Sequence, residues 1–245
     1  MEQRTAAVSV RNVTKRFGPV LANDKVCLDI YRGEILALLG ENGSGKTTLM
    51  NMLSGIYYPD EGEIYINGKP VSISSPKESF HLGIGMIHQH FKLVECFSVL
   101  DNIILGQEDS HMGVLQKKKA REKVLALSQR CNLKIDPDAK ISNISVGMQQ
   151  RVEILKMLYR DNEILIFDEP TAVLTPQEID ELMEIMRGFK AEGKSILFIT
   201  TSWRKLRPWP TGAPFCARAS TWVPWMWPPP LWRRCPGSWW AGMCS

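Results

Sequence analysis

The feature that most limits the folds open to this chain of 245 residues is a glycine-rich loop between an apolar run and a helical pattern. Residues 40–47 read Gly-Glu-Asn-Gly-Ser-Gly-Lys-Thr and fill every fixed position of the pattern G-x-x-x-x-G-K-[ST]. The apolar run at residues 35–39 is typical of a buried strand, and residues 48–53 carry apolar side chains at helical spacing. A strand, a phosphate-binding loop and a helix in this order predict a site for a nucleoside triphosphate.

The residue types in this loop suit the binding of phosphate groups. Glycines at positions 40, 43 and 45 let the backbone turn its N–H groups inward, and Lys46 supplies positive charge at the β- and γ-phosphates. The hydroxyl group of Thr47 is expected on Mg²⁺. The predicted nucleotide-binding residues of the loop are Gly40, Glu41, Asn42, Gly43, Ser44, Gly45, Lys46, Thr47 and Thr48.

A second apolar run, at residues 164–167, ends in two adjacent carboxylates, Asp168 and Glu169. Side chains alternate along a strand, so the two carboxylates point in different directions and can serve different purposes. We expect Asp168 to contribute to the Mg²⁺ site and Glu169 to orient or deprotonate an attacking water. The alternative is a pair of acids that are merely solvated at a strand end, and the intact phosphate loop disfavours it.

The segment after these carboxylates predicts a helix and a further strand. Thr175, Pro176 and Glu178 stand at the N-cap, first-turn proline and capping-box positions of a helix that Gly193 closes. Its apolar residues at helical spacing are expected in the core rather than on a ligand surface: Ile179, Leu182, Met183, Met186 and Phe189. Residues 195–200 read as the next strand, so strands and helices alternate, as in an α/β fold with a mostly parallel sheet.

Charge, cysteine content and hydropathy exclude other classes of protein. The net charge of +4 arises from six basic residues after residue 200, where there is no acid, so residues 1–200 carry −2 and nucleic-acid binding is not expected. The six cysteines show no metal-ligand spacing and are expected as reduced thiols. No apolar run approaches the roughly 20 residues of a membrane span, and residues 1–5 lack the layout of a secretory signal. We therefore expect a cytosolic protein, or one held at a membrane by a partner.

Residues 144–152 read Ile-Ser-Val-Gly-Met-Gln-Gln-Arg-Val, and through them the chain resembles the ATP-binding subunits of ABC transporters. Of the family's L-S-G-G-Q signature, Ser145 and Gly147 are kept, whereas Ile144, Val146 and Met148 differ. The resemblance implies that Ser145 and Gly147 bind the ATP held by a second ATP-binding domain, and that ATP and Mg²⁺ are the cofactors. Taken alone, the serine could simply be a helix N-cap.

Other positions agree with the family in order and spacing. Phe17 stands where the family stacks an aromatic ring on adenine, although a core phenylalanine is the alternative. Gln89 matches the glutamine that contacts Mg²⁺ and the attacking water, while its neighbours His88 and His90 lack a third ligand and are not expected to bind a metal. The region of residues 92–102 matches the surface that receives a permease, and residues 172–175 occupy the place of the D-loop.

The resemblance covers about residues 8–200 and extends to a branch of the family. The wording of residues 144–156 and 171–178 is similar to that of importers for nucleosides and simple sugars, and the chain resembles the N-terminal ATPase half of those proteins. The implied fold is an α/β P-loop NTPase core, an ATP-binding domain of residues 1–200 with an inserted helical subdomain at about residues 78–160. The implied partners are transmembrane permease subunits, a second ATP-binding domain and, indirectly, a solute-binding protein. The implied location is the cytoplasmic face of the cell membrane.

The composition changes abruptly after Thr200. All eight tryptophans and eight of the fifteen prolines follow this residue, and Thr201 stands where the family has a histidine that contacts the γ-phosphate. Re-reading the codons one base earlier can encode a continuation that begins with histidine, so we interpret residues 201–245 as the product of a shifted reading frame. We expect an aberrant, poorly ordered tail, and ATP binding with weak or absent turnover. The prolines disfavour the alternative, a helix at a membrane interface.

Two alternatives to an importer subunit stay open on the sequence. One is a soluble ABC ATPase of DNA repair or translation, although the long coiled coil or charged linking helix of those proteins is missing from residues 1–200. The other is a nucleotide-binding chain that does not hydrolyse ATP, which the missing histidine favours.

Overall fold

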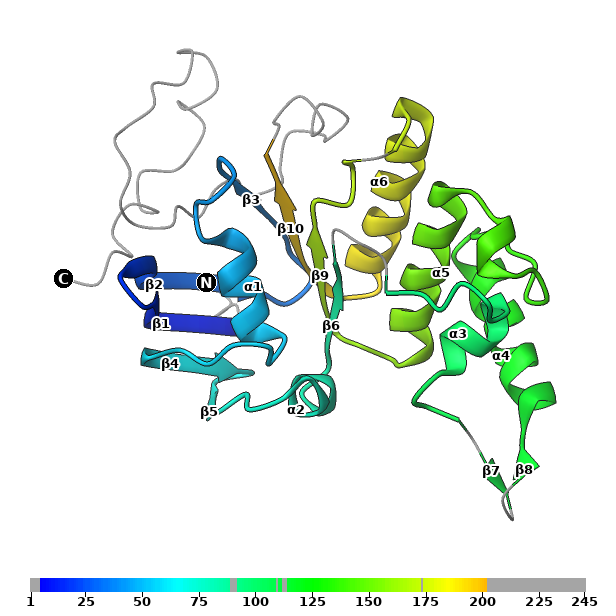
Figure 1. Ribbon diagram of the computed structural model, residues 1–245, viewed down its shortest axis with the longest axis horizontal. Coiled ribbons are helices and arrows are strands. Elements are labelled where there is room, and N and C mark those ends of the chain that lie inside the picture. The colour runs from blue at the N-terminus through cyan, green and yellow to red at the C-terminus, as the bar shows by residue number, and fades with distance from the viewer. Residues whose placement is uncertain (1–4, 89–91, 109, 112–113, 173, 202–245) are drawn as a thin grey trace.

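A computed structural model describes residues 5–88, 92–108, 110–111, 114–172 and 174–201. Two four-stranded sheets and a group of helices form successive layers, with helix α1 (Lys46–Leu53) between the two sheets (Figure 1). The aberrant tail predicted at residues 201–245 lies outside the described residues except for Thr201. No helix among the described residues has the length and apolar character needed to cross a membrane.

The central sheet is parallel and confirms the α/β fold. Its order is β3-β10-β9-β6, and all neighbouring strands run in the same direction. The four strands are β3 (Ile35–Leu39), β6 (Ile84–Ile87), β9 (Ile164–Asp168) and β10 (Ser195–Thr200). Three of them, β3, β9 and β10, coincide with apolar runs predicted as strands, because each run is buried on both faces of the sheet.

The two faces of this sheet pack into two separate apolar clusters. In β9, Ile164 and Ile166 lie in the cluster that includes α1, whereas Leu165 and Phe167 lie in the cluster on the opposite face. This follows from the two-residue period of a strand. Asp168 has the same parity as Ile166, so the alternation directs it toward the side of α1.

The second sheet is antiparallel, and the sequence reasoning missed it. Its order is β2-β1-β4-β5, with β1 (Ala6–Phe17), β2 (Val20–Tyr31), β4 (Glu61–Ile66) and β5 (Lys69–Val71). Asn67 and Gly68 join β4 to β5, and both have positive φ angles, 51° and 76°. An Asn-Gly pair between two short runs is the signal of such a hairpin and could have revealed it.

Helices cover the other face of the parallel sheet (Figure 1). Helices α3 (Val99–Ile104), α4 (Lys117–Arg130) and α5 (Val146–Tyr159) pack on one another, with the hairpin β7 (Ser110–His111) and β8 (Val114–Leu115) and the 3₁₀ turn η1 (Ile141–Asn143) between them in sequence. The range of about 78–160 expected for a helical subdomain also contains most of α2 (Pro76–His81) and β6, and β6 pairs with β9 in the core sheet. We propose that the helical subdomain begins after β6.

Helix α6 (Pro176–Ala191) has the boundaries that the sequence predicts. The hydroxyl of Thr175 accepts a hydrogen bond from the N–H of Glu178, whose carboxylate in turn accepts from the N–H of Thr175, so both halves of the capping box form. Of the predicted core residues, Leu182, Met183, Met186 and Phe189 are buried, and Ile179 packs partly buried against them.

Candidate nucleotide-binding site

The residues predicted around the phosphates converge at one edge of the parallel sheet. The carboxyl ends of β3, β9, β10 and β6 all lie there, because the strands are parallel. Residues 40–45 connect β3 to α1 at this edge, and Asp168 and Thr200 end the two neighbouring strands. Ligands of open α/β sheets bind outside the carboxyl ends of the strands, so the topology itself makes this edge a binding site.

Lys46 is the first residue of α1 and is held inside the loop that precedes it. Its ammonium group donates hydrogen bonds to the carbonyl oxygens of Gly40 (2.8 Å) and Glu41 (2.7 Å) and to the hydroxyl of Ser44 (3.0 Å). Burial lowers the pKa of Lys46, and the carboxylates of Glu169 and Asp168 act against this shift. The positive charge therefore stands in a poorly hydrated place beside two acids.

Gly45, at the N-cap of α1, shows why the loop needs glycine. Its φ angle is +79°, and an added Cβ would lie 2.2 Å from the carbonyl oxygen of Ala22. Neither the backbone conformation nor the space admits a side chain. No side chain caps α1, so the N–H groups of its first turn are directed toward the loop, where they favour an anion.

Asp168 is 2% exposed and lies against the start of α1. Its carboxylate accepts a hydrogen bond from the hydroxyl of Thr47, while its Oδ1 has no hydrogen-bond partner among the described residues. Burial raises the pKa of Asp168 despite the hydrogen bond from Thr47 and the charge of Lys46. A buried oxygen without a partner beside a threonine hydroxyl is a set of hard oxygen donors that fits Mg²⁺.

Glu169 leaves the strand in a conformation that is rare for its type. Its φ angle is +49°, in the left-handed region. The N–H of Glu169 donates to the carbonyl of Ile199 (3.1 Å), and its carbonyl accepts from the N–H of Ala172 (3.1 Å). The chain therefore turns at Glu169, directly after Asp168 ends strand β9.

Ser145 and Gly147 begin helix α5, away from their own phosphate loop. The hydroxyl of Ser145 is the N-cap of α5 and accepts from the N–H of Met148 (3.3 Å). Helix α5 packs on the face of the parallel sheet opposite to α1. The structure therefore brings Lys46, Thr47, Asp168 and Glu169 together, whereas Ser145 begins a helix on the other face of the sheet.

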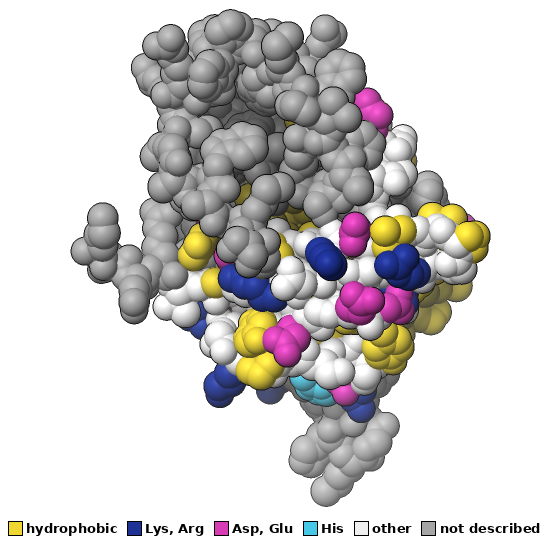
Figure 2. Space-filling model, turned by 90° about the vertical axis from the view of Figure 1, so that its left-hand side faces the viewer, with side chains coloured by type: hydrophobic (Ala, Val, Ile, Leu, Met, Phe, Trp, Pro, Cys, Tyr) yellow, Lys and Arg dark blue, Asp and Glu magenta, His cyan; other side chains and the backbone are white. Residues whose placement is uncertain are grey.

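Phe17 lies on the surface and is not a core residue. Its side chain is 40% exposed, its ring meets that of Tyr57 edge to face at 5.1 Å between centroids, and the ammonium of Lys15 is 5.5 Å from its centroid. Val20, Leu21, Ile56 and Tyr58 are also exposed large apolar residues of this part of the chain. Figure 2 shows hydrophobic patches among charged side chains on the face where the antiparallel sheet lies.

The predicted Gln89 and its neighbour His90 lie outside the described residues. So does Val173, which belongs to the expected D-loop. Strand β6 ends at Ile87, so the chain reaches the carboxyl edge of the sheet directly before position 89. The neighbouring His88 is half-buried, and burial lowers its pKa to about 4, with the charge of Lys92 adding to the shift. His88 is therefore neutral at pH 7.

Sequence reasoning did not find Asn23, which supports the phosphate loop from the antiparallel sheet. This residue of β2 is 3% exposed, and its Nδ2 donates to the carbonyl of Gly45 (3.2 Å). Its Oδ1 is buried without a partner among the described residues. No local pattern marks Asn23, because its contact depends on how the second sheet packs over α1.

Comparisons with known proteins also indicate an ATP-binding domain. The family described as ABC transporter matches residues 23–172. The nucleoside import ATP-binding protein NupA of Lactococcus lactis is 58% identical over 82% of this chain and 40% of its own length. The guanosine import ATP-binding protein NupO of Bacillus subtilis is 55% identical over 78% of this chain and 37% of its own. A nucleotide-free ATP-binding cassette from an ABC transporter superposes with a TM-score of 0.75, 25% identity and coverage of 83% of this chain and 84% of that one. The chain spans about two fifths of the length of these two import proteins.

Proposed function

Because the chain belongs to the ABC transporter family, we propose that it binds and hydrolyses ATP as an energy-coupling subunit, or part of one, of an importer for nucleosides or simple sugars. The observation that carries the proposal is the meeting of Lys46, Thr47 and Asp168 at the carboxyl edge of the parallel sheet. Two opposite charges and a hydroxyl stand there at the end of a glycine-rich loop, which is the arrangement that a Mg²⁺-bound triphosphate requires.

The residues of this site divide the work of phosphoryl transfer to water. Lys46 and the N–H groups of residues 40–48 hold the phosphates, and Phe17 stacks on adenine. Thr47, Asp168 and Gln89 would hold Mg²⁺, which would neutralise charge on the phosphates. Glu169 accepts a proton from the attacking water, whose oxygen bonds to the γ-phosphorus as the bond to the bridging oxygen of ADP breaks.

The proposed solute and partners rest on the named relatives and on the geometry of α5. Nucleosides and simple sugars are proposed because import proteins for a nucleoside and for guanosine are more than half identical to this chain. Ser145 and Gly147 lie apart from the phosphate loop of their own chain, so they complete the site of a second ATP-binding domain. Permease subunits hold the assembly at the cytoplasmic face of the membrane, and a solute-binding protein acts indirectly through them.

A second candidate is a chain that binds ATP and does not turn it over. Strand β10 lies between β3 and β9, so the residue after Thr200 lies beside the phosphate loop and the two acids. Position 201 is an exposed threonine, which has no imidazole to place at the γ-phosphate. Threonine at this position favours slow or absent hydrolysis over a fully active subunit.

One experiment tests both candidates. ATP binding and hydrolysis are measured side by side on this chain and on a version whose residues from 201 onward are restored to the alternative reading frame. We expect both chains to bind Mg²⁺-ATP and only the restored chain to hydrolyse it at an appreciable rate. Failure of both chains to bind ATP would refute the proposed function, and equal turnover would refute the second candidate and the frameshift interpretation.

A further inference from the structure

We propose that Gln150 of helix α5 is a positioning residue for Glu169. The side-chain amide of Gln150 donates to the carbonyl oxygen of Pro170 at 2.9 Å, and Pro170 directly follows Glu169. This inference rests on the proposed function, since it deepens the role given there to Glu169. Through this bond helix α5, whose N-cap is Ser145, directly holds the segment that carries Glu169, the proposed general base.

The bond between Gln150 and Pro170 is buried and joins two distant parts of the chain. Gln150 is 3% exposed, and its bond to Pro170 joins helix α5 to the turn after β9, twenty residues away in sequence. In such a place water cannot replace a lost donor, so removing the amide would leave the carbonyl unsatisfied. The contact therefore restrains the turn and does more than fill space.

Glu169 needs such a restraint because its backbone conformation is unfavourable. A left-handed φ angle of +49° in a glutamate persists only where the surrounding bonds impose it. Two backbone bonds act on Glu169 itself, to Ile199 and from Ala172. A third bond, from Gln150 of helix α5 to the carbonyl oxygen of Pro170, acts on the next residue.

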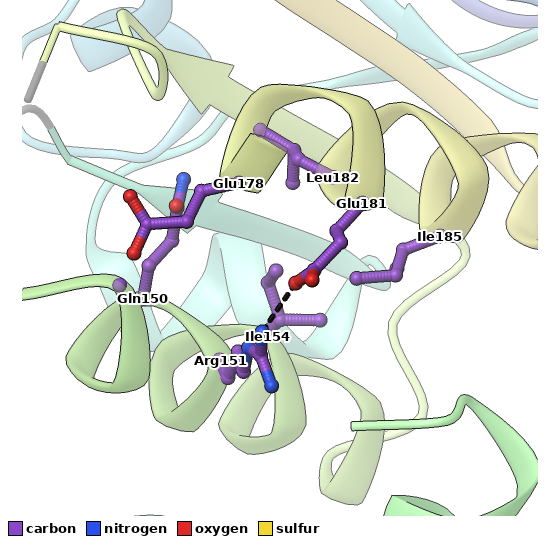
Figure 3. A pocket seen from close by; sticks show the side chains of 8 residues that line it. Gln150, Arg151, Ile154, Glu178, Glu181, Leu182 and Ile185 are labelled. Carbon is purple, nitrogen blue, oxygen red and sulfur yellow. Dashed lines mark hydrogen bonds and ion pairs between the residues drawn. The ribbon is translucent and has the colours of Figure 1, made fainter. Parts of the chain in front are cut away.

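Helix α5 is itself fixed against α6, so the amide of Gln150 has a defined place (Figure 3). Arg151 forms an ion pair with Glu181 of α6. Figure 3 shows Gln150 and Glu178 side by side at one end of this interface and Ile154 facing Ile185 farther along it. A movement of α5 must therefore move the donor that holds Pro170, which couples the position of Ser145 to that of Glu169.

The test compares two matched substitutions in neighbouring residues of α5. Gln150→Met keeps the length of the side chain and removes the donor, whereas Arg151→Met removes an interface ion pair and leaves the bond to Pro170. Amide hydrogen exchange is followed residue by residue in the full chain. We expect the amides of Glu169 and Ala172 to exchange about tenfold faster in Gln150→Met, the effect of losing one hydrogen bond. The amides of Ile166 and Phe198 should be unchanged in both variants, and Arg151→Met, which loses only a partly exposed ion pair, should accelerate exchange at Glu169 and Ala172 much less than Gln150→Met does.

Nucleotide binding and turnover complete the test. ATP affinity should stay within about twofold in both variants, and where the parent chain turns ATP over, Gln150→Met should lower kcat and leave KM unchanged. Unaltered exchange at Glu169 and Ala172 in Gln150→Met, or equal acceleration in both variants, would overturn the inference. The exchange measurement needs no ATP. Failure to bind nucleotide would therefore refute the proposed function, and exchange would still test whether Gln150 restrains this turn.

Discussion

At the scale of single residues, the phosphate loop concentrates charges that water hydrates poorly. Burial moves the pKa of Lys46 down and that of Asp168 up, so each group is shifted toward its neutral form. Burying these two charged groups costs more free energy than burying hydrophobic side chains of similar size would. A ligand that pairs with both charges, as a triphosphate with its cation does, offsets this cost of burial.

Replacing Lys46 by alanine should abolish tight ATP binding without unfolding the protein. The ammonium group bonds to loop atoms only, so its loss removes the charge at the phosphates and leaves the sheet intact. We expect ATP affinity to fall about 10- to 100-fold, the worth of one or two charge-assisted hydrogen bonds. Equilibrium binding of a fluorescent ATP analogue measures this, with Lys118→Ala on the exposed surface of α4 as the control. Equal affinities of the two variants would contradict the role of Lys46.

A side chain at position 147 should displace the carboxylate of Glu178. An added Cβ would lie 2.0 Å from Oε1 of Glu178, whose carboxylate also completes the capping box of α6. Gly147→Ala is therefore expected to lower the free energy of unfolding by up to about 1 kcal/mol, because the carboxylate of Glu178 must leave its capping position. Gly188→Ala, in α6 with open space around it, is the control and should be neutral or stabilising. Urea unfolding of the two variants decides between strain at 147 and a general effect of alanine.

At the scale of elements, helix α5 has two halves with different surroundings. Its first turns meet α6, whereas its last turns carry the buried Glu153 and the partly buried Lys156, and the partly buried Arg160 is its C-cap. Glu153 is 7% exposed and accepts a hydrogen bond from the N–H of Lys92 (3.2 Å). Burial raises the pKa of Glu153 more than Lys156 lowers it, so the ionised carboxylate is disfavoured in the folded protein.

The buried Glu153 gives a prediction about pH. An acid whose pKa is raised on folding contributes stability below its unfolded pKa, near 4.5, and this contribution is lost as pH rises through the folded pKa. Relative to Glu153→Gln, which is neutral at every pH, the wild type should thus lose stability as pH rises above about 4.5 through the folded pKa of Glu153. The difference in the free energy of unfolding between the two proteins, measured by urea titration at each pH, isolates this group. A difference that is constant, or that grows in favour of the wild type with pH, would contradict the prediction.

The elements also show which parts of the fold local patterns can predict. Local patterns predict strands β3, β9 and β10 and helix α6, because an apolar run or a capping box is a property of a few adjacent residues. Local patterns do not predict the antiparallel sheet, since β1 pairs with β4 across more than forty intervening residues and the register of this pair contains bulges. Glu169 was predicted by position, but its left-handed backbone and the hold of Gln150 depend on tertiary packing.

At the scale of the whole molecule, the residues of the proposed nucleotide site lie on two opposite sides of the parallel sheet. The phosphate loop opens beside α1, and Ser145 begins a helix on the opposite face of the sheet. A complete site of the kind proposed therefore needs two copies of this domain, or this domain and a related one. Such a head-to-tail arrangement buries each nucleotide between two chains.

ATP should therefore drive association of this chain. We expect the apparent mass measured by light scattering to rise toward that of a dimer when Mg²⁺-ATP is added, most clearly in Glu169→Gln, where the nucleotide persists. Ser145→Arg should abolish the effect while leaving ATP binding to the separate chain unchanged. A mass that stays monomeric with saturating ATP in Glu169→Gln would argue that this chain completes its site only with a different partner.

The strand order has a consequence for how the chain acquires its fold as it is synthesised. Among the described residues, the sheet neighbour of β3 is β10, which is the last strand to leave the ribosome. The strand that leads into the phosphate loop must therefore wait, unpaired and apolar, until residues 195–200 have emerged. Long-range pairing of this kind is slow and exposes the nascent chain to aggregation. A ribosome that stalls before residue 195 would hold a chain whose nucleotide site cannot yet be assembled, and ATP could stabilise it only after β10 is in place.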